Sequence, residues 1–124
     1  MYDETTPMSK SSYQFINLEY LEMMSDGDES MKKVMLEMLI SELPEEIQKM
    51  STHSNDSNWD ELSSVSHKMK STLAFVGNDQ MTNANRDIEM IAKTKEGTSK
   101  IPHLIKTLES VAPKVLEELK IEMT

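Results

Sequence analysis

Apolar residues recur at every third or fourth position in five stretches of the chain. Such spacing gathers them on one face of an α-helix, where they can be buried together. The stretches cover residues 18–24, 29–50, 60–77, 79–95 and 100–122. Pro44 and Pro113 lie within the two longest stretches. Because proline cannot donate a backbone hydrogen bond, we expect Pro44 to bend or divide its helix and Pro113 to kink its own.

Polar residues and glycine mark the expected helix ends. Asn17, Asp28 and Asn78 each stand just before an apolar stretch, as N-cap residues do. Gly77 closes the stretch 60–77 and suits the left-handed conformation that often ends a helix. Residues 51–57 are polar, so we expect a loop there that ends in a cap for the next helix.

These patterns predict an all-α fold. Four long amphipathic helices with short connections favour an antiparallel up-down four-helix bundle, with residues 18–24 as a short additional N-terminal helix. We expect the bundle domain to span residues 13–124, and the polar residues 1–12 to form a flexible arm. Most of the 12 methionines lie on the apolar stripes, so we expect them mainly to fill the core.

Length, charge and composition restrict the possible functions. The chain has 124 residues, enough for one domain, and its net charge of −9 argues against nucleic acid or an anionic membrane as partner. It has no cysteine, which excludes disulfides and thiol chemistry. No apolar run approaches the roughly 20 residues of a membrane span, and residues 1–12 lack a signal-peptide pattern. We therefore expect a cytoplasmic protein, and a monomer because the apolar stripes can satisfy one another.

His67 stands out on the polar side of the stretch 60–77. A helix turns by about 100° per residue, which places His67 about 160° from the centre of the apolar stripe and facing solvent. Lys70 lies on the same side and can bring its ammonium group to the imidazole. The neighbours on this side are small, namely Ser63, Ser64, Ser71 and Ala74. The arrangement presents a ring nitrogen to a partner protein, with a cation beside it.

Other kinds of site have little support in the sequence. The three histidines are far apart and no metal-ligand spacing occurs, so we expect no metal site. His53, in the expected loop, and His103 are interpreted as ordinary surface residues. No serine is framed by glycines, and no residue in local spacing would orient His67 as a base, which argues against a hydrolase. The three glycines stand alone, so no phosphate-binding loop is present and we expect no ATP binding.

The sequence from His67 to Gly77, HKMKSTLAFVG, resembles the signature of the histidine phosphotransfer (Hpt) domains of bacterial phosphorelays. That signature is His-x-x-Lys-Gly-Ser, followed by small or apolar residues and a closing glycine. Family members are four-helix bundles with an optional short leading helix, and their phosphorylated histidine lies on the second bundle helix, where His67 is predicted. Ser71 departs from the usual glycine, but serine is nearly as small.

The resemblance implies a function in two-component signalling. His67 would accept a phosphoryl group from the phospho-aspartate of a receiver domain and pass it to another response-regulator receiver. The protein would be a phosphocarrier rather than an enzyme, without autokinase activity or a cofactor of its own. The receiver would bring magnesium, and a hybrid sensor histidine kinase would supply the phosphoryl group upstream.

The resemblance also implies roles for the neighbours of His67. Lys70 would steady the phosphoryl oxygens, Ser71 could donate a hydrogen bond to them, and Lys68 would help through its positive field. Exposed apolar residues of the first helices, such as Met23 or Met24, would frame the contact with the receiver. The residues expected to lie closest to the docked receiver are Ser63, Ser64, Lys68 and Ala74.

Three alternatives stay open at this point. The chain could be an Hpt-like adaptor that docks receiver domains or other proteins without being phosphorylated, which a phosphorylation assay would decide. It could be the substrate domain of a larger histidine kinase, although the initial Met1 and the lack of a kinase or receiver segment favour a free-standing protein. A small helical hydrolase has the least support, because the sequence shows no catalytic constellation for it.

Overall fold

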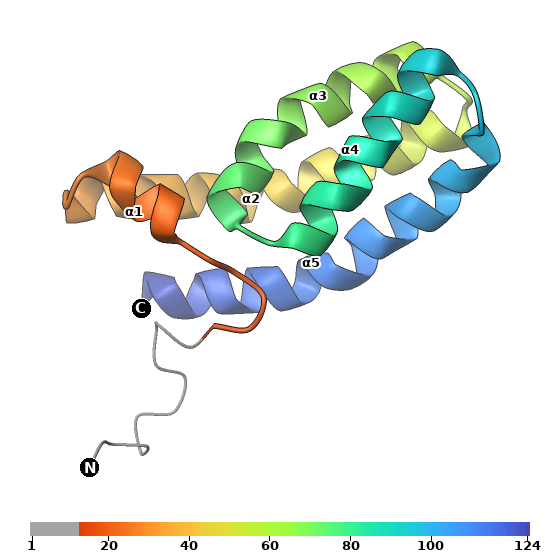
Figure 1. Cartoon of the computed structure of the whole chain (residues 1–124). Coiled ribbons are helices and arrows are strands. Elements are labelled where there is room, and N and C mark those ends of the chain that lie inside the picture. The colour runs from red at the N-terminus through yellow and green to blue at the C-terminus, as the bar shows by residue number, and fades with distance from the viewer. Residues whose placement is uncertain (1–12) are drawn as a thin grey trace.

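The computed structural model describes residues 13–124, which contain helices joined by short turns and no strand (Figure 1). The elements are α1 (Glu19–Ser25), α2 (Glu29–Asn55), α3 (Trp59–Val76), α4 (Asp79–Thr94), the short 3-10 helix η2 (Thr98–Lys100) and α5 (Ile101–Met123). The all-α prediction is therefore confirmed for this part of the chain. The predicted arm, residues 1–12, lies outside the described residues.

The four long helices contact one another in a closed ring. α2 packs against α3 and α5, and α4 packs against the same two helices. The short α1 lies against α2 and α3 near one end of the bundle (Figure 1). Helix α3 therefore has α2 on one side and α4 on the other, and both can supply side chains to a site on its surface.

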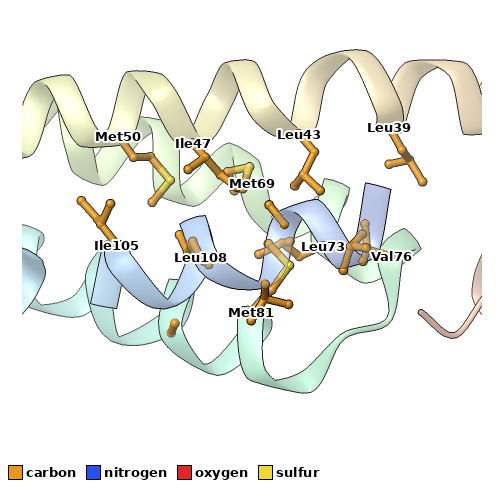
Figure 2. Packing of buried hydrophobic residues seen from close by; sticks show 14 of the residues in the cluster. Leu39, Leu43, Ile47, Met50, Met69, Leu73, Val76, Met81, Ile105 and Leu108 are labelled. Carbon is orange, nitrogen blue, oxygen red and sulfur yellow. The ribbon is translucent and has the colours of Figure 1, made fainter. Parts of the chain in front are cut away.

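The core lies where the apolar faces of the helices meet. Figure 2 shows a row of side chains along α2 facing residues from α3, α4 and α5. The labelled residues are Leu39, Leu43, Ile47, Met50, Met69, Leu73, Val76, Met81, Ile105 and Leu108, all of them buried. Burying a side chain of this size stabilises the fold by roughly 1.5 to 3 kcal/mol, so the apolar face of α3 fixes the direction of its polar face.

Helix α2 is longer than predicted. It continues to Asn55 rather than ending at residue 50, so residues 51–55 of the predicted loop are helical and only residues 56 and 57 lie in a turn. His53 is therefore half-buried in the last turn of the helix. Packing against the bundle outweighs the weak helix propensity of this polar segment. The helix also passes through Pro44 without division, and α5 likewise continues through Pro113.

Several apolar residues in the first half of α2 lie at the surface rather than in the core. Met31, Val34 and Met38 are 48%, 59% and 37% exposed, whereas Leu36 is buried. Apolar residues occur on both sides of this segment, so spacing alone did not select the correct face. Of the methionines in residues 13–124, only some fill the core: Met50, Met69 and Met81 are buried, but Met23, Met24, Met31, Met38 and Met90 are exposed.

Two of the predicted caps are confirmed. Asp28 and Asn78 accept the backbone N–H groups of Met31 and Met81 at 3.0 Å and 2.9 Å. The predicted cap at Asn17 is wrong by one position, because the N-cap residue of α1 is Leu18. The side-chain oxygen of Asn17 accepts the N–H of Glu19 at 3.0 Å. The predicted cap for α3 is wrong, because that helix follows Asn58 and has no side-chain cap.

Gly77 ends α3 in the predicted left-handed conformation, with φ of 73°. The N-terminal segment 13–18 passes directly over this turn, and the N–H of Asn17 donates to the carbonyl oxygen of Val76 at 3.0 Å. A Cβ atom at position 77 would collide with the carbonyl oxygen of Asn17. Glycine is thus required here both for its backbone conformation and for the close approach of the N-terminal segment.

Candidate functional site

His67 lies near the middle of α3, on the side opposite the core. Its side chain is 67% exposed. Leu62, Met69 and Leu73 on the other side of the same helix are buried. The helical periodicity therefore places the imidazole at the surface, as predicted from the sequence.

One nitrogen of this imidazole is held by a buried carboxylate on the next helix. Nδ1 of His67 lies 2.9 Å from Oε2 of Glu89 on α4, and Glu89 is only 7% exposed. An ionised carboxylate only accepts hydrogen bonds, so the contact requires the proton on Nδ1. In the neutral ring the lone pair then belongs to Nε2, the nitrogen that does not contact Glu89.

Lys70 contacts the same carboxylate rather than the imidazole. Its Nζ lies 3.0 Å from Oε1 of Glu89, so the two oxygens of Glu89 serve two different partners. The expected approach of the ammonium group to the ring of His67 is therefore replaced by a link through Glu89. Both side chains leave α3 toward α4, and Glu89 lies between them.

The charge of Glu89 follows from these contacts. Burial raises the pKa of this carboxyl group, but the hydrogen bonds from His67 and Lys70 outweigh burial, and the pKa is lower than the ordinary 4.5. Glu89 is therefore ionised at neutral pH. A fixed negative charge next to Nδ1 stabilises any positive charge that develops on the ring of His67.

A pair of buried polar residues holds α3 and α4 in register beside the site. The hydroxyl of Ser66 donates to Oδ1 of Asn85 at 2.7 Å, and the amide of Asn85 donates to the carbonyl oxygen of Ser66 at 3.0 Å. Both residues are at most 2% exposed. Ser66 directly precedes His67, and Asn85 lies one turn before Glu89. These bonds therefore keep the imidazole within reach of the carboxylate.

A groove of about 560 Å³ lies beside His67 between α2 and α3. Lys68 and Ser71, two of the predicted site residues, line it together with Phe75. Lys68 and Ser71 are both exposed. The predicted docking residues that do not line this groove are the half-buried Ser63 and the exposed Ser64 and Ala74.

The family model of the Hpt domain matches residues 34–122, which include α3, α4 and almost all of α2 and α5. The chain belongs to the Hpt family. Hpt domains act in phosphorelays by carrying phosphoryl groups on histidine, and they interact with receiver domains and histidine kinases. As a family they are phosphocarriers rather than enzymes. No curated protein and no solved structure matches the chain.

Sequence reasoning missed three residues of this Hpt site. Glu89, Ser66 and Asn85 are polar residues whose positions face the interior of the bundle. A signal was present, because Glu89 lies three residues before Ala92, which belongs to the apolar stripe of the same helix. That signal indicates a buried charge that needs partners, but it does not say which helix provides them.

Residues 13–124 contain no group of three or more His, Asp or Glu side chains that could hold a metal ion. Within the same range, no helix is long and apolar enough to cross a membrane. The surface of α3 in this Hpt domain carries an exposed imidazole with a buried carboxylate partner and an adjoining groove.

Proposed function

We propose that His67 of this Hpt protein accepts a phosphoryl group from the phospho-aspartate of a receiver domain and passes it to the aspartate of another receiver. The observation that carries the proposal is the exposed imidazole whose Nδ1 is held by the buried Glu89 at 2.9 Å. That contact leaves the lone pair on Nε2, and a nucleophile for phosphoryl transfer needs such a lone pair.

In the accepting step, Nε2 of the neutral ring attacks phosphorus in line with the bond to the aspartate oxygen. The N–P bond forms, the P–O bond breaks, and the aspartate leaves as a carboxylate. The ring of His67 then carries a positive charge, which the ionised Glu89 offsets through the proton on Nδ1. Transfer to the next receiver reverses these changes and restores the neutral imidazole.

The exposed side chains around His67 would stabilise the phosphoryl group. Phosphorylation adds about −1.5 to −2 charge to the site. The side chain of Lys70 is 53% exposed and can turn from Glu89 toward the phosphoryl oxygens. Ser71 lies one turn after His67 and can donate its hydroxyl to one of these oxygens, while Lys68 adds a second positive charge.

The receiver would dock over α1, α2 and α3 beside His67. The ring of Tyr20 on α1 stacks on Phe75 of α3 with the ring centroids 5.1 Å apart, and Phe75 lines the groove next to His67. Met38 also lines the groove and extends this apolar surface, and Met24 on α1 is exposed. Methionine side chains adapt to different partners, which suits a carrier that must dock both a donor and an acceptor.

The remaining parts of the proposal concern the protein as a whole. We infer that it brings no cofactor or metal to the reaction, so that the receiver supplies magnesium and a hybrid sensor histidine kinase supplies the phosphoryl group. We also propose that residues 13–124 form one antiparallel up-down bundle that acts as a cytoplasmic monomer. The net charge of −9 makes nucleic acids and anionic membranes poor partners.

The test is phosphoryl transfer from phosphorylated receiver domains of the same organism to the wild-type protein and to His67→Gln. Mass spectrometry under conditions that preserve phosphohistidine should find the label on wild type alone, at His67. The variant should stay folded because the side chain is exposed. Label on His67→Gln would contradict the assignment. Docking without label from any receiver would favour the adaptor function instead.

A further inference from the structure

The groove beside His67 has carboxylates on one wall and a lysine on the other. Lys68 lies on the α3 side, next to His67. Three carboxylates, Glu42, Glu45 and Glu46, form the α2 side. Their spacing of three and four residues places them on one face of that helix. A partner that covers the groove must therefore lie against a row of acidic side chains.

The three carboxylates of the groove differ in their ion pairs. Glu46 pairs with Lys49, whose Nζ lies 3.2 Å from Oε2 of Glu46. Within the part of the chain that the structure describes, neither Glu42 nor Glu45 forms an ion pair. Glu45 is exposed and Glu42 is half-buried at the groove edge. Their charges are available to a docked partner.

The apolar surface next to this acidic row is continuous with the docking surface proposed above. Met38 lies one turn before Glu42 and also lines the groove, opposite Phe75. Met38 is 37% exposed. An apolar patch bordered by unpaired charges is the usual arrangement of a specific, transient interface, in which the rim charges select the partner.

We propose that Glu42 and Glu45 select receiver domains that carry lysine or arginine at the edge of an apolar contact surface. The inference rests on the proposed function, because it concerns the partner that docks over His67. A receiver with such a basic edge gains from complementary charge during encounter. A receiver with acidic side chains at the same place meets repulsion, both from this edge and from the overall net charge of −9.

The experiment measures the initial rate of phosphoryl transfer from a panel of phosphorylated receivers to wild type and to the double variant Glu42→Gln/Glu45→Gln. Glu109→Gln/Glu117→Gln is the matched control, since it removes two exposed carboxylates from α5, which forms no wall of the groove. Circular dichroism shows that each variant keeps its helical fold. Each reaction is repeated at increasing salt concentration.

We expect the double variant in the groove to slow transfer from the most active receivers about three- to tenfold at low salt, as the loss of two rim charges predicts. The difference should shrink as salt screens the charges. The control pair should match wild type. The double variant Glu42→Lys/Glu45→Lys should slow phosphoryl transfer from the same receivers further. It should speed transfer from receivers with an acidic edge.

Two results separate failure of this inference from failure of the proposed function. In the first, wild type is labelled at His67 while both double Gln variants accept the phosphoryl group as fast as wild type does. In that case the acidic row does not select the partner, and this inference is wrong. Equal slowing of both double variants also contradicts it, because the effect would then come from net charge. If no receiver labels wild type, the proposed function fails and takes this inference with it.

Discussion

At His67, a buried carboxylate lies behind an exposed imidazole. Free neutral histidine exchanges its proton between two nitrogens, but the contact of Nδ1 with Glu89 at 2.9 Å favours one arrangement. The second oxygen of Glu89 holds Lys70 at 3.0 Å. Glu89, which lies on a different helix, therefore contacts both the ring of His67 and the ammonium group of Lys70. It fixes the proton on Nδ1 and offsets positive charge on the ring.

Glu89→Gln should slow phosphorylation of His67 by phosphoramidate about five- to tenfold, because a neutral amide stabilises the ring cation less than a carboxylate does. Phosphoramidate is a small donor, so receiver docking does not enter the rate. The ¹⁵N chemical shifts of the ring should report less of the form with the proton on Nδ1. Glu96→Gln, which changes an exposed carboxylate after α4, serves as the control.

The dependence of the free energy of unfolding on pH, below neutral pH, tests the same carboxylate. Because the pKa of Glu89 is lower in the folded protein than the ordinary 4.5, its ionised form adds stability above that value. This contribution is lost as the pH falls through the folded-state pKa. The free energies of unfolding of wild type and Glu89→Gln should therefore converge in acid. A constant difference would mean that the carboxylate charge is not what stabilises the contact.

At the scale of the elements, the α3–α4 turn brings His67 and Glu89 onto adjacent helices. The turn depends on Gly77 with φ of 73° and on Asn78, whose side chain caps α4 and also donates to the carbonyl oxygen of Phe15 at 2.9 Å. The end of α3, the start of α4 and the N-terminal segment thus meet at one place. A change there should affect the stability of the whole bundle.

Gly77→Ala should lower the free energy of unfolding by about 2 to 5 kcal/mol, since left-handed strain costs about 1 to 2 kcal/mol and overpacking about 1 to 3 kcal/mol. The matched control is Gly97→Ala, which has φ of 78° but open space around the added Cβ. Gly97→Ala should lower the free energy of unfolding only by the cost of left-handed strain, about 1 to 2 kcal/mol. Urea unfolding measures both. Equal losses would show that the contact with Asn17 adds nothing.

At the scale of the whole molecule, polar contacts join the N-terminal segment to the last helix. The carboxylate of the buried Glu118 accepts the N–H groups of residues 14–16 at 2.8 to 3.1 Å. Glu122 accepts the hydroxyl of Tyr13 at 2.9 Å and pairs with Lys32 at 2.6 Å. Burial and the bond to Glu122 raise the pKa of Tyr13, and the bond to Glu122 raises the pKa of Lys32 despite burial.

Glu118→Gln should lower the free energy of unfolding by about 1.5 to 3 kcal/mol, because it removes the charge that three backbone donors share. Hydrogen exchange should become faster at the amides of residues 14–16. Glu117→Gln, at the exposed neighbouring position, should change neither quantity. Unchanged exchange in Glu118→Gln would show that these amides are protected by other parts of the fold.

Much of this molecule follows from the periodicity of its sequence. The number and order of the helices, the caps at Asp28 and Asn78, and the exposure of His67 were predictable, since each depends on residues within one or two turns. The end of α2 was not, because packing decided whether its polar residues remain helical. The buried face of α2 was not predictable either, because Met31, Val34 and Leu36 are all apolar and only Leu36 is buried.

The sequence by itself determined an all-α fold for residues 13–124, with an exposed histidine on a helix that resembles the Hpt signature. Only the tertiary structure decided what lies behind that histidine. Glu89 is 22 residues away and comes within 2.9 Å of His67 because the bonds between Ser66 and Asn85 hold α3 and α4 in register. Helical spacing describes one face of one helix, whereas contacts between helices depend on how several faces pack together.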